Sequence, residues 1–336
     1  MNSFELLSEK IQKKIWEMKW ENFTPVQNKT IPVVMNTNKH LVISSDTASG
    51  KTEAAFLPIL SKIEKEAIDS LKIIYISPLK ALINNQFDRI NDLCEGMKIQ
   101  IHRWHGDVPA SRKKKLIEKP SGILQITPES IESLFINRTN YLTSLFKDVE
   151  YIIIDEIHAF IGTDRGIHLR SLLDRINRFV NKRVRIMGLS ATVSNFNEIK
   201  KWVSFNNPND VEIIQSSGFD KKLLYSLLHF SDEKTNVLSI DLINDIRNLT
   251  RNRNALIFSN SRASVELLTH SLNRISQSEG FGDCYYPHHS SIDAKLREDI
   301  EKEMIKSKVY KSIVSTSTLE LGIDIGDIDI VIQVDS

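Results

Sequence analysis

Residues 41–55 read LVISSDTASGKTEAA, a short apolar run that ends in a turn and leads into a segment of helical period. The run predicts a buried strand, and the turn places Gly50, Lys51 and Thr52 between that strand and a helix. Backbone N–H groups at a helix start attract phosphate, Lys51 would contact the β- and γ-phosphates, and the Thr52 hydroxyl would ligate Mg²⁺. Because Ser45 replaces the first glycine of the G-x-x-x-x-G-K-[ST] pattern, the turn alone is also compatible with an ordinary helix start.

Apolar runs like this one recur along the first two thirds of the chain. Each is followed by a longer segment with a helical period, and they lie at residues 41–44, 73–77, 122–127, 151–155 and 185–190. Runs without polar alternation are typical of strands that helices cover on both faces. We therefore predict an α/β fold in which the first domain, residues 1–215, holds a parallel sheet flanked by helices.

After Ile214 the chain turns polar and Ser-rich, and strands resume only at Ala255. We place a domain boundary there, so that residues 216–336 form a second, smaller α/β domain. Its predicted elements are a strand at residues 255–259, two helices at 264–275 and 294–307 with a His-containing segment between them, and two strands at 312–316 and 329–336. The chain stops at Ser336, directly after a strand, and we expect this second domain to be incomplete.

Composition limits the class of protein. The 336 residues are many for one hydrophobic core, and 41% hydrophobic with 26% charged residues is ordinary for a folded soluble protein. A formal net charge of +1 excludes a global basic field, so any nucleic-acid binding must use local groups. Cys94 and Cys284 lie far apart, which gives no support for a disulfide framework or a zinc site. With no run as long as a membrane span, and residues 1–14 predicted to be an amphipathic helix, we expect a cytoplasmic protein.

A second chemical feature is the acidic pair in YIIIDEIHAF. Asp155 and Glu156 end an apolar strand, at the sheet edge where open α/β proteins bind ligands. Asp155 would hold Mg²⁺, and Glu156 would accept a proton from the water that attacks the γ-phosphate. A solvated acidic strand end is the alternative for this pair alone, but a phosphate loop followed by an acidic pair on a later strand favours a nucleotide hydrolase.

Several motifs, in this order, resemble those of superfamily 2 DEAD/DEAH-type helicases. They are FTPVQ at 23–27, SPLKALINNQ at 77–86, WHGD at 104–107, TPES at 127–130, DEIH at 155–158 and SAT at 190–192. The run that begins with DEIH, the later HHSSI and STSTLELGIDIGDIDIVIQ resemble the large helicase-related (Lhr-like) branch in particular. The resemblance implies two RecA-like domains, ATP with Mg²⁺ as cofactor, and 3′ to 5′ movement on a single strand, with DNA favoured over RNA.

The resemblance also assigns roles by position. It implies catalysis by Lys51, Asp155 and Glu156, with Mg²⁺ held by Thr52 and Asp155. For ATP binding it implies Gln27 at the adenine edge together with Ala48, Ser49, Gly50, Lys51, Thr52, Gly322 and Asp324. Coupling of hydrolysis to strand binding falls to His158, Ser190 and Thr192. The implied strand path comprises Ser77, Pro78, Lys80, Thr127 and Pro128, and then Asn260, Arg262, Ser315, Thr316 and Ser317.

The family pattern continues with a Gln-Arg-Gly-Arg segment that supplies arginine fingers, and this sequence ends before it. Because such arginines are worth about 10³ to 10⁵ in rate, we expect nucleotide binding with weak hydrolysis, in a fragment of a longer helicase. The missing region or a protein partner would supply the arginines. The alternative function is an ATP-gated nucleic-acid-binding or regulatory module. A translocase on duplex and an RNA-directed motor also remain open.

Two further features receive plainer interpretations. The run SRKKKL, which begins at Ser111, is interpreted as a solvated helix start and not as a binding patch. His288 and His289 lack a second pair of metal ligands at suitable spacing, so a loop or strand-path role is favoured over zinc.

Overall fold

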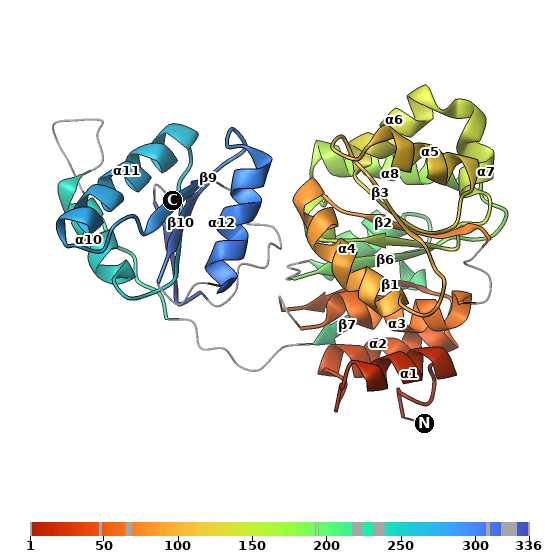
Figure 1. Ribbon diagram of the computed structural model, residues 1–336. Helices are drawn as coiled ribbons and strands as arrows, with labels where there is room; N and C mark the ends of the chain where they lie inside the picture. Colours follow the sequence, from red (N-terminus) through yellow and green to blue (C-terminus); the bar gives the residue numbers. More distant parts are fainter. Residues whose placement is uncertain are drawn as a thin grey trace. The chain divides into compact units, whose positions relative to one another are not determined.

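The computed structural model describes residues 2–46, 49–64, 69–191, 193, 195–216, 224–230, 239–306, 310–316 and 328–334. The chain divides into two compact units, unit 1 (residues 1–221) and unit 2 (residues 222–336) (Figure 1). The predicted α/β architecture with two parallel sheets is confirmed. The boundary at residue 215 stays a prediction, because residues 217–223 lie outside the described residues.

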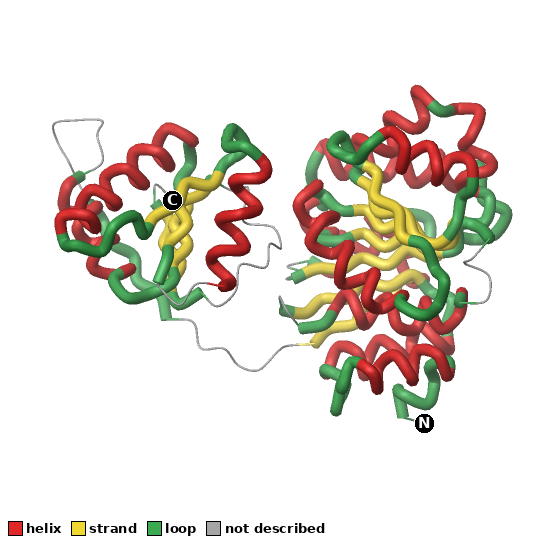
Figure 2. Tube along the Cα trace, in the orientation of Figure 1, coloured by secondary structure: helices red, strands yellow, loops and turns green. Residues whose placement is uncertain are grey.

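Unit 1 is built on a seven-stranded sheet in the order β3-β4-β2-β5-β6-β1-β7, and every pairing in it is parallel (Figure 2). The strands are β1 His40–Ser45, β2 Leu71–Ile76, β3 Ile101–Trp104, β4 Gly122–Ile126, β5 Tyr151–Ile154, β6 Arg185–Ser190 and β7 Val211–Ser216. The five strands expected from apolar runs are all present. The two additional ones, β3 and β7, are the edges of the sheet.

Helices cover both faces of this sheet (Figure 1). One hydrophobic cluster packs a first group of helices on one face: α1 Glu9–Glu17, α2 Pro25–Asn36, α3 Lys51–Ile63 and α4 Lys80–Cys94. A second cluster packs another group on the other face: α5 Ala110–Glu118, α6 Pro128–Asn137, α7 Leu142–Phe146, α8 Asp164–Asn177 and α9 Phe196–Val203. Short 3₁₀ turns lie at η1 Thr139–Tyr141, η2 Ile157–Ala159 and η3 Pro208–Asp210. The double cover explains why the central strands read as uninterrupted apolar runs.

The helix expected over residues 1–14 is shorter and starts later. α1 begins at Glu9, and the residues before it form turns in which the Glu5 N–H donates to the Asn2 carbonyl. The Gln12 side chain holds those turns, since its Nε2 donates to the carbonyls of Phe4 and Leu7. Within the described residues, no helix has the length and apolar character that crossing a membrane requires.

Unit 2 repeats the pattern on a smaller scale. Its strands, β8 Ala255–Phe258, β9 Tyr285–His288, β10 Ser312–Ser315 and β11 Ile330–Gln333, pair in parallel in the order β11-β8-β10-β9. Helices α10 Ile240–Thr250 and α11 Arg262–Ser278 pack in one hydrophobic cluster. Helix α12 Ala294–Lys306 packs in another through Ile300 and Met304. The predicted incompleteness of this unit stays a prediction.

Candidate active site

Most candidate residues of unit 1 follow the carboxyl ends of strands, whereas Gln27 lies in the first turn of α2. Residues 49–52 come after β1, residues 77–80 after β2, residues 127–128 after β4 and residues 155–158 after β5, while Ser190 is the last residue of β6. Because the strands are parallel, these ends lie along one edge of the sheet, where open α/β folds bind ligands. Ala48 and Thr192 lie outside the described residues.

The phosphate-loop candidate joins β1 to α3, as the sequence predicts. Gly50 is the residue before α3 and has φ +87°, a left-handed conformation that glycine adopts without strain. A Cβ atom at Gly50 would lie 2.6 Å from Nε2 of Gln27. The loop can approach Gln27 this closely only because residue 50 has no side chain.

Gln27 is buried and connects this loop to the start of α2. Its Oε1 accepts a hydrogen bond from the Thr24 N–H at 2.9 Å, and Thr24 Oγ1 accepts one from the Gln27 N–H at 3.4 Å. This reciprocal pair is a capping box that fixes the first turn of α2. The remaining amide nitrogen of Gln27 faces Gly50.

Lys51 lies inside the loop, and its ammonium donates to the carbonyls of Ser45 at 2.5 Å and Asp46 at 2.6 Å. Burial lowers the pKa of Lys51, whereas the nearby carboxylates of Glu156 and Asp155 act in the opposite direction. Ser49 Oγ is buried and has no hydrogen-bond partner among the described residues. The loop thus combines a cation with a hydroxyl that is ready for another partner.

Asp155 is almost fully buried at the end of β5. The Tyr75 hydroxyl donates to its Oδ2, and the Glu156 N–H donates to its Oδ1 at 3.1 Å. Burial, together with the neighbouring charge of Glu156, raises the pKa of Asp155 to about 6. Tyr75, fully buried in β2, is a partner that sequence reasoning missed, because a tyrosine in an apolar run reads as core.

Glu156 has φ +46°, a left-handed conformation that is uncommon for a residue with a side chain. His158 Nδ1 lies 3.1 Å from Ser190 Oγ and 3.4 Å from Glu156 Oε2. The shorter contact is the hydrogen bond, so Glu156 Oε2 is buried without a hydrogen-bond partner in the described part of the chain. Burial raises the pKa of Glu156 and lowers that of His158.

The strand-path candidates of unit 1 are mostly buried. Ser77 is fully buried and its hydroxyl has no partner among the residues described, while Pro78, Thr127 and Pro128 are also buried. Lys80 is exposed and forms an ion pair of 3.3 Å with Asp107. A ligand would therefore contact the backbone of these loops more than their side chains.

Arg165, at the start of α8, ties two of these loops together. Its Nη2 donates to the Pro78 carbonyl at 2.6 Å, and its Nε donates to Glu129 Oε1 at 2.7 Å. One guanidinium thereby fixes the loop after β2 against the first turn of α6. No sequence motif pointed to this residue, although it lies within the run DEIHAFIGTDRGIH.

Unit 2 brings its own candidates to the carboxyl ends of β8 and β10. Asn260 and Arg262 are exposed, and Arg262 Nη1 donates to Ser291 Oγ at 2.7 Å. Ser315 is fully buried with its hydroxyl 2.8 Å from the His288 carbonyl, and Thr316 follows it. Ser317, Gly322 and Asp324 lie outside the described residues.

His288 is the last residue of β9, and His289 follows it. The ring of each is hydrogen-bonded to a carboxylate. His288 Nε2 lies 3.0 Å from Glu301 of α12, and His289 Nε2 lies 2.7 Å from Glu266 of α11. Both rings therefore fix helices against the end of β9.

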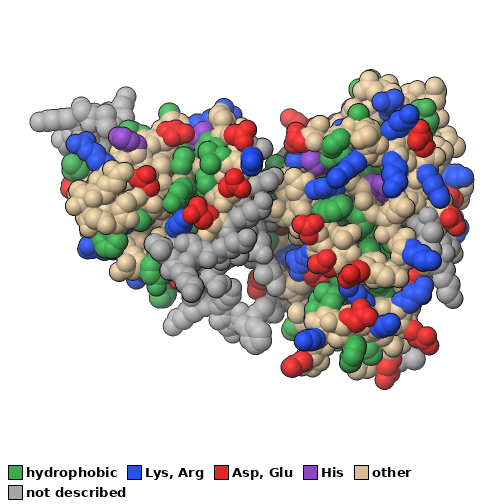
Figure 3. Space-filling model, viewed as in Figure 1, with side chains coloured by type: hydrophobic (Ala, Val, Ile, Leu, Met, Phe, Trp, Pro, Cys, Tyr) green, Lys and Arg blue, Asp and Glu red, His purple; other side chains and the backbone are tan. Residues whose placement is uncertain are grey.

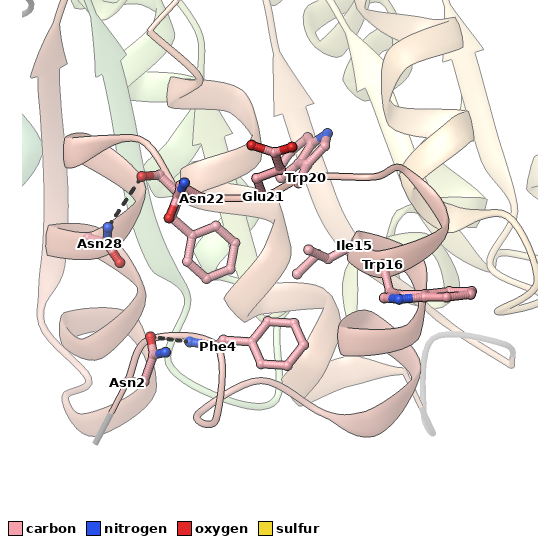
Figure 4. Close-up of a pocket in the computed structure, with 9 residues that line it drawn as sticks. Asn2, Phe4, Ile15, Trp16, Trp20, Glu21, Asn22 and Asn28 are labelled. Atoms are coloured by element: carbon pink, nitrogen blue, oxygen red, sulfur yellow. Dashed lines mark hydrogen bonds between the residues drawn. The ribbon is translucent and has the colours of Figure 1, made fainter.

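A cavity of about 340 Å³ lies at α1 and the start of α2, beside the capping box (Figure 4). The rings of Phe4, Trp16 and Trp20 line it, together with the amides of Asn22 and Asn28. Figure 4 shows Asn22 and Asn28 on one side of Phe4 and the two tryptophans on the other. Aromatic rings with a few amides suit a flat, polar-edged ligand.

A second cavity, of about 570 Å³, lies at the other end of the sheet. His40 and Ile186, near the starts of β1 and β6, line it together with Arg170 and Trp202. None of the candidate site residues takes part in it.

Residues 24–199 match the DEAD/DEAH box helicase family, a match that covers more than half of the chain. The chain belongs to this helicase family. Residues 234–336 match the helicase conserved C-terminal domain, so the second unit of this helicase is matched as well. The sequence-based recognition of a superfamily 2 helicase is thereby confirmed.

Curated relatives confirm the likeness to the Lhr-like branch. The helicase is 33% identical to the ATP-dependent helicase Lhr-Core of Saccharolobus solfataricus, over 96% of this chain and 39% of the relative. It is 32% identical to Lhr-Core of Methanocaldococcus jannaschii, over 99% of this chain and 40% of the relative. The chain thus spans about two fifths of the length of these relatives.

Solved structures agree with this fold. The helicase Lhr of Mycobacterium smegmatis, bound to single-stranded DNA and AMP-PNP, matches with a TM-score of 0.82 and 27% identity, over 99% of this chain and 44% of that chain. The helicase MrfA bound to DNA and AMPPNP matches with a TM-score of 0.81 and 22% identity, over 98% of this chain and 46% of that chain, and this match supports the fold alone.

Proposed function

We propose that the chain is the ATP-dependent motor core of a helicase that moves 3′ to 5′ on single-stranded DNA. The observation that carries this proposal is the convergence of Lys51, Asp155 and Glu156 at one edge of the unit 1 sheet, close enough for their charges to influence one another's pKa values. The relatives' names support ATP use, and the Lhr structure with single-stranded DNA and AMP-PNP supports the choice of strand and nucleotide.

The nucleotide's phosphates would contact the loop between β1 and α3. Backbone N–H groups at the start of α3 attract their negative charge, and Lys51 would exchange its two carbonyl partners for phosphate oxygens. The unpaired Ser49 hydroxyl is a further donor at the same loop. The base would enter the cavity lined by Phe4, Trp20 and Asn28, the residue that follows Gln27 in α2.

Glu156 is the residue suited to accept the proton of the attacking water. Its Oε2 is buried without a partner among the described residues, and burial raises the pKa of the carboxyl group, which makes it a stronger base than an exposed glutamate. Both oxygens of Asp155 already accept hydrogen bonds, from the Tyr75 hydroxyl and the Glu156 N–H. Asp155 is therefore the residue suited to hold Mg²⁺, and Glu156 the one suited to accept the proton.

The oxygen groups of Thr52 and Asp155 fit a magnesium site, since hydroxyl and carboxylate oxygens are the ligands that Mg²⁺ prefers. Glu156, next to Asp155 in the chain, supports the fit: its Oε2 is buried without a hydrogen-bond partner among the described residues, and a metal-bound water would supply the donor. When bound, Mg²⁺ would neutralise charge that develops on the phosphates.

The link between the nucleotide and the strand would run through His158 and Ser190. Burial lowers the pKa of His158, which favours the neutral ring, and the Nδ1 of that ring is hydrogen-bonded to the Ser190 hydroxyl. The strand itself would contact the loops at Ser77, Pro78, Lys80, Thr127 and Pro128, and the ends of β8 and β10 at Asn260, Arg262, Ser315 and Thr316. Thr192, Ser317, Gly322 and Asp324 keep the roles that the family resemblance implies.

Hydrolysis of ATP with and without single-stranded DNA tests this proposal, with nucleotide binding measured in parallel. Glu156→Gln is expected to lower turnover by about 10²- to 10⁴-fold while nucleotide still binds, because the general base is lost. Glu9→Gln, an exposed change at the start of α1, serves as the matched control and should leave turnover intact. Nucleotide binding with no turnover under any condition, even in a longer parent protein, would favour the ATP-gated binding module instead.

A further inference from the structure

Strand β3 and helix α5 carry an unusual density of positive charge. Residues 98–119 contain seven Lys or Arg and two Asp or Glu, whereas the whole chain has 44 and 43. The group defined here as the β3–α5 basic surface comprises Lys80, Arg103, Arg112, Lys113, Lys114, Lys115 and Lys119. In Figure 3, Lys and Arg side chains gather on the part of unit 1 where Figure 1 places α5.

Most of these cations have no anionic partner. Lys80 pairs with Asp107 and Lys114 with Glu118, at 3.3 and 3.5 Å, but the other five form no ion pair with any described residue. Two of them pack on aromatic rings: the Arg103 guanidinium lies 4.2 Å from the centre of Phe87, and the Lys113 ammonium 5.8 Å from that of Trp104. Such packing orders the side chain without neutralising its charge.

The charge also works against the helix that carries it. Arg112 and Lys115, three apart, and Lys115 and Lys119, four apart, are like-charge neighbours on one side of α5, an arrangement that destabilises helices. Lys115, in the last turn of α5, is favoured there by the helix dipole, but the like charges along the helix still repel one another. A polyanion bound along the surface would turn the repulsion into attraction.

The basic surface adjoins the loops assigned to the strand path. Trp104, the last residue of β3, is paired with Ile126 of β4, so His105 lies beside Thr127. A Cβ at Gly106 would lie 3.0 Å from the Lys80 ammonium. Burial has the largest effect on the pKa of His105 and lowers it, Asp107 raises it, and the charges of Lys80, Arg103 and Lys113 lower it further. Three cations therefore converge where β3 ends, directly next to the loops at residues 77–80 and 127–128.

We propose that the β3–α5 basic surface binds the phosphate backbone of single-stranded DNA beyond the stretch that the loops at residues 77–80 and 127–128 hold. This inference rests on the proposed function and extends it by a second contact region on unit 1. Lysines and arginines on a helix face contact phosphates without reading sequence, so the surface adds affinity and not specificity.

The test is the salt dependence of binding to fluorescent poly-dT oligonucleotides of increasing length. The variant carries Lys114→Gln, Lys115→Gln and Lys119→Gln, three exposed changes that leave the loops untouched. Each lost phosphate contact reduces the slope of log K against log salt by about 0.7, so the triple variant should lose roughly 2 from the slope on long oligonucleotides. On the shortest oligonucleotide that still binds, variant and wild type should match.

A charge-matched control carries Lys10→Gln, Lys13→Gln and Lys201→Gln, all exposed and distant in sequence from the basic surface. An unchanged slope in the test variant, or an equal loss in test and control variants, overturns the inference while the proposed function stands. Failure of the wild-type chain to bind any oligonucleotide at low salt overturns the proposed function itself. Equal nucleotide binding by all three proteins verifies that the fold is intact.

Discussion

Tyr75 gives the buried carboxylate of Asp155 its only side-chain donor among the described residues. Tyr75→Phe removes that donor at a cost of about 1–3 kcal/mol and leaves Asp155 Oδ2 unpaired. We expect the Mg²⁺ concentration that half-saturates nucleotide binding to rise several-fold, because the carboxylate is no longer held in one orientation. Binding of a fluorescent nucleotide, titrated with Mg²⁺, measures this.

Tyr286→Phe is the matched control for that change, since its hydroxyl donates to the Asp283 carbonyl at 3.1 Å and its ring lies near Lys311, in unit 2 and outside the candidate magnesium site. An identical Mg²⁺ titration for Tyr75→Phe and wild type would mean that Asp155 needs no such support.

The raised pKa of Asp155 makes a prediction about stability. The folded value of about 6 exceeds the ordinary 3.8, so between pH 4 and 6 the folded chain holds the proton that the unfolded chain has lost. Stability therefore falls as the pH rises through this window, and the loss is complete above pH 6. It is on the order of 2–3 kcal/mol, at about 1.4 kcal/mol for each pKa unit.

Asp155→Asn removes that penalty, and its melting temperature at pH 7.5 in a chelator should exceed that of wild type by several degrees. The difference should vanish at pH 4, where both side chains are neutral. A variant that is less stable at pH 7.5 would show that the carboxylate is not destabilised by burial. Turnover should be lost in either case, which makes Asp155 a site of conflict between stability and activity.

Arg165 of α8 connects two other elements, since its guanidinium binds both Glu129 of α6 and the loop after β2. Arg165→Ala frees the Pro78 carbonyl and Glu129, so the loops at residues 77–80 and 127–130 lose their common anchor. Affinity for single-stranded DNA should fall about five- to tenfold, with nucleotide binding unchanged. Arg170→Ala, on the same helix but stacked over Phe205, is the control and should bind DNA normally. Equal DNA affinity in both variants would exclude the anchoring role.

In unit 1, the sequence predicted the strands that are covered on both faces and missed the two edge strands. In unit 2 it predicted three strands, including the edge strand β11, and missed β9. The central strands, such as β2 and β5, are buried at every position and read as apolar runs. The edge strands β3 and β7 have mixed burial and include Arg103 and Glu212, so their pattern resembled that of a loop. The capping box at the start of α2 was not predicted either. The family motif assigns Gln27 to nucleotide binding, and its hydrogen bond to Thr24 is seen only in the folded chain.

The residues of the candidate site were likewise predicted only in part from the sequence. The phosphate loop and the acidic pair were visible because their residue types are tied to short local spacing. Tyr75 and Arg165 were not, because each acts on a residue some 80 positions away through strand order, which local patterns do not encode.

For the whole chain, each hydrophobic cluster of described residues belongs to one unit. We therefore expect residues 1–221 to fold when produced alone, because their two clusters need nothing from unit 2. A nucleotide analogue with Mg²⁺ at 100 times its Kd should stabilise this fragment by about 2.7 kcal/mol, or roughly 5–10 °C in melting temperature. Calorimetry of the fragment and of the full chain checks this. A fragment without a cooperative transition would contradict the independence of the units.

The capping box beside Gly50 gives the molecule a reporter of its own. The Thr24 amide hydrogen is sequestered by Oε1 of Gln27, the side chain whose Nε2 faces the phosphate loop. If the nucleobase forms a hydrogen bond with Oε1, the Thr24 amide loses its acceptor and exchanges its hydrogen with solvent. If the nucleobase bonds only Nε2, the exchange of this amide stays slow. The rate at one backbone position, read in heavy water, would thus tell which edge of the glutamine side chain meets the nucleotide, without any label on either partner.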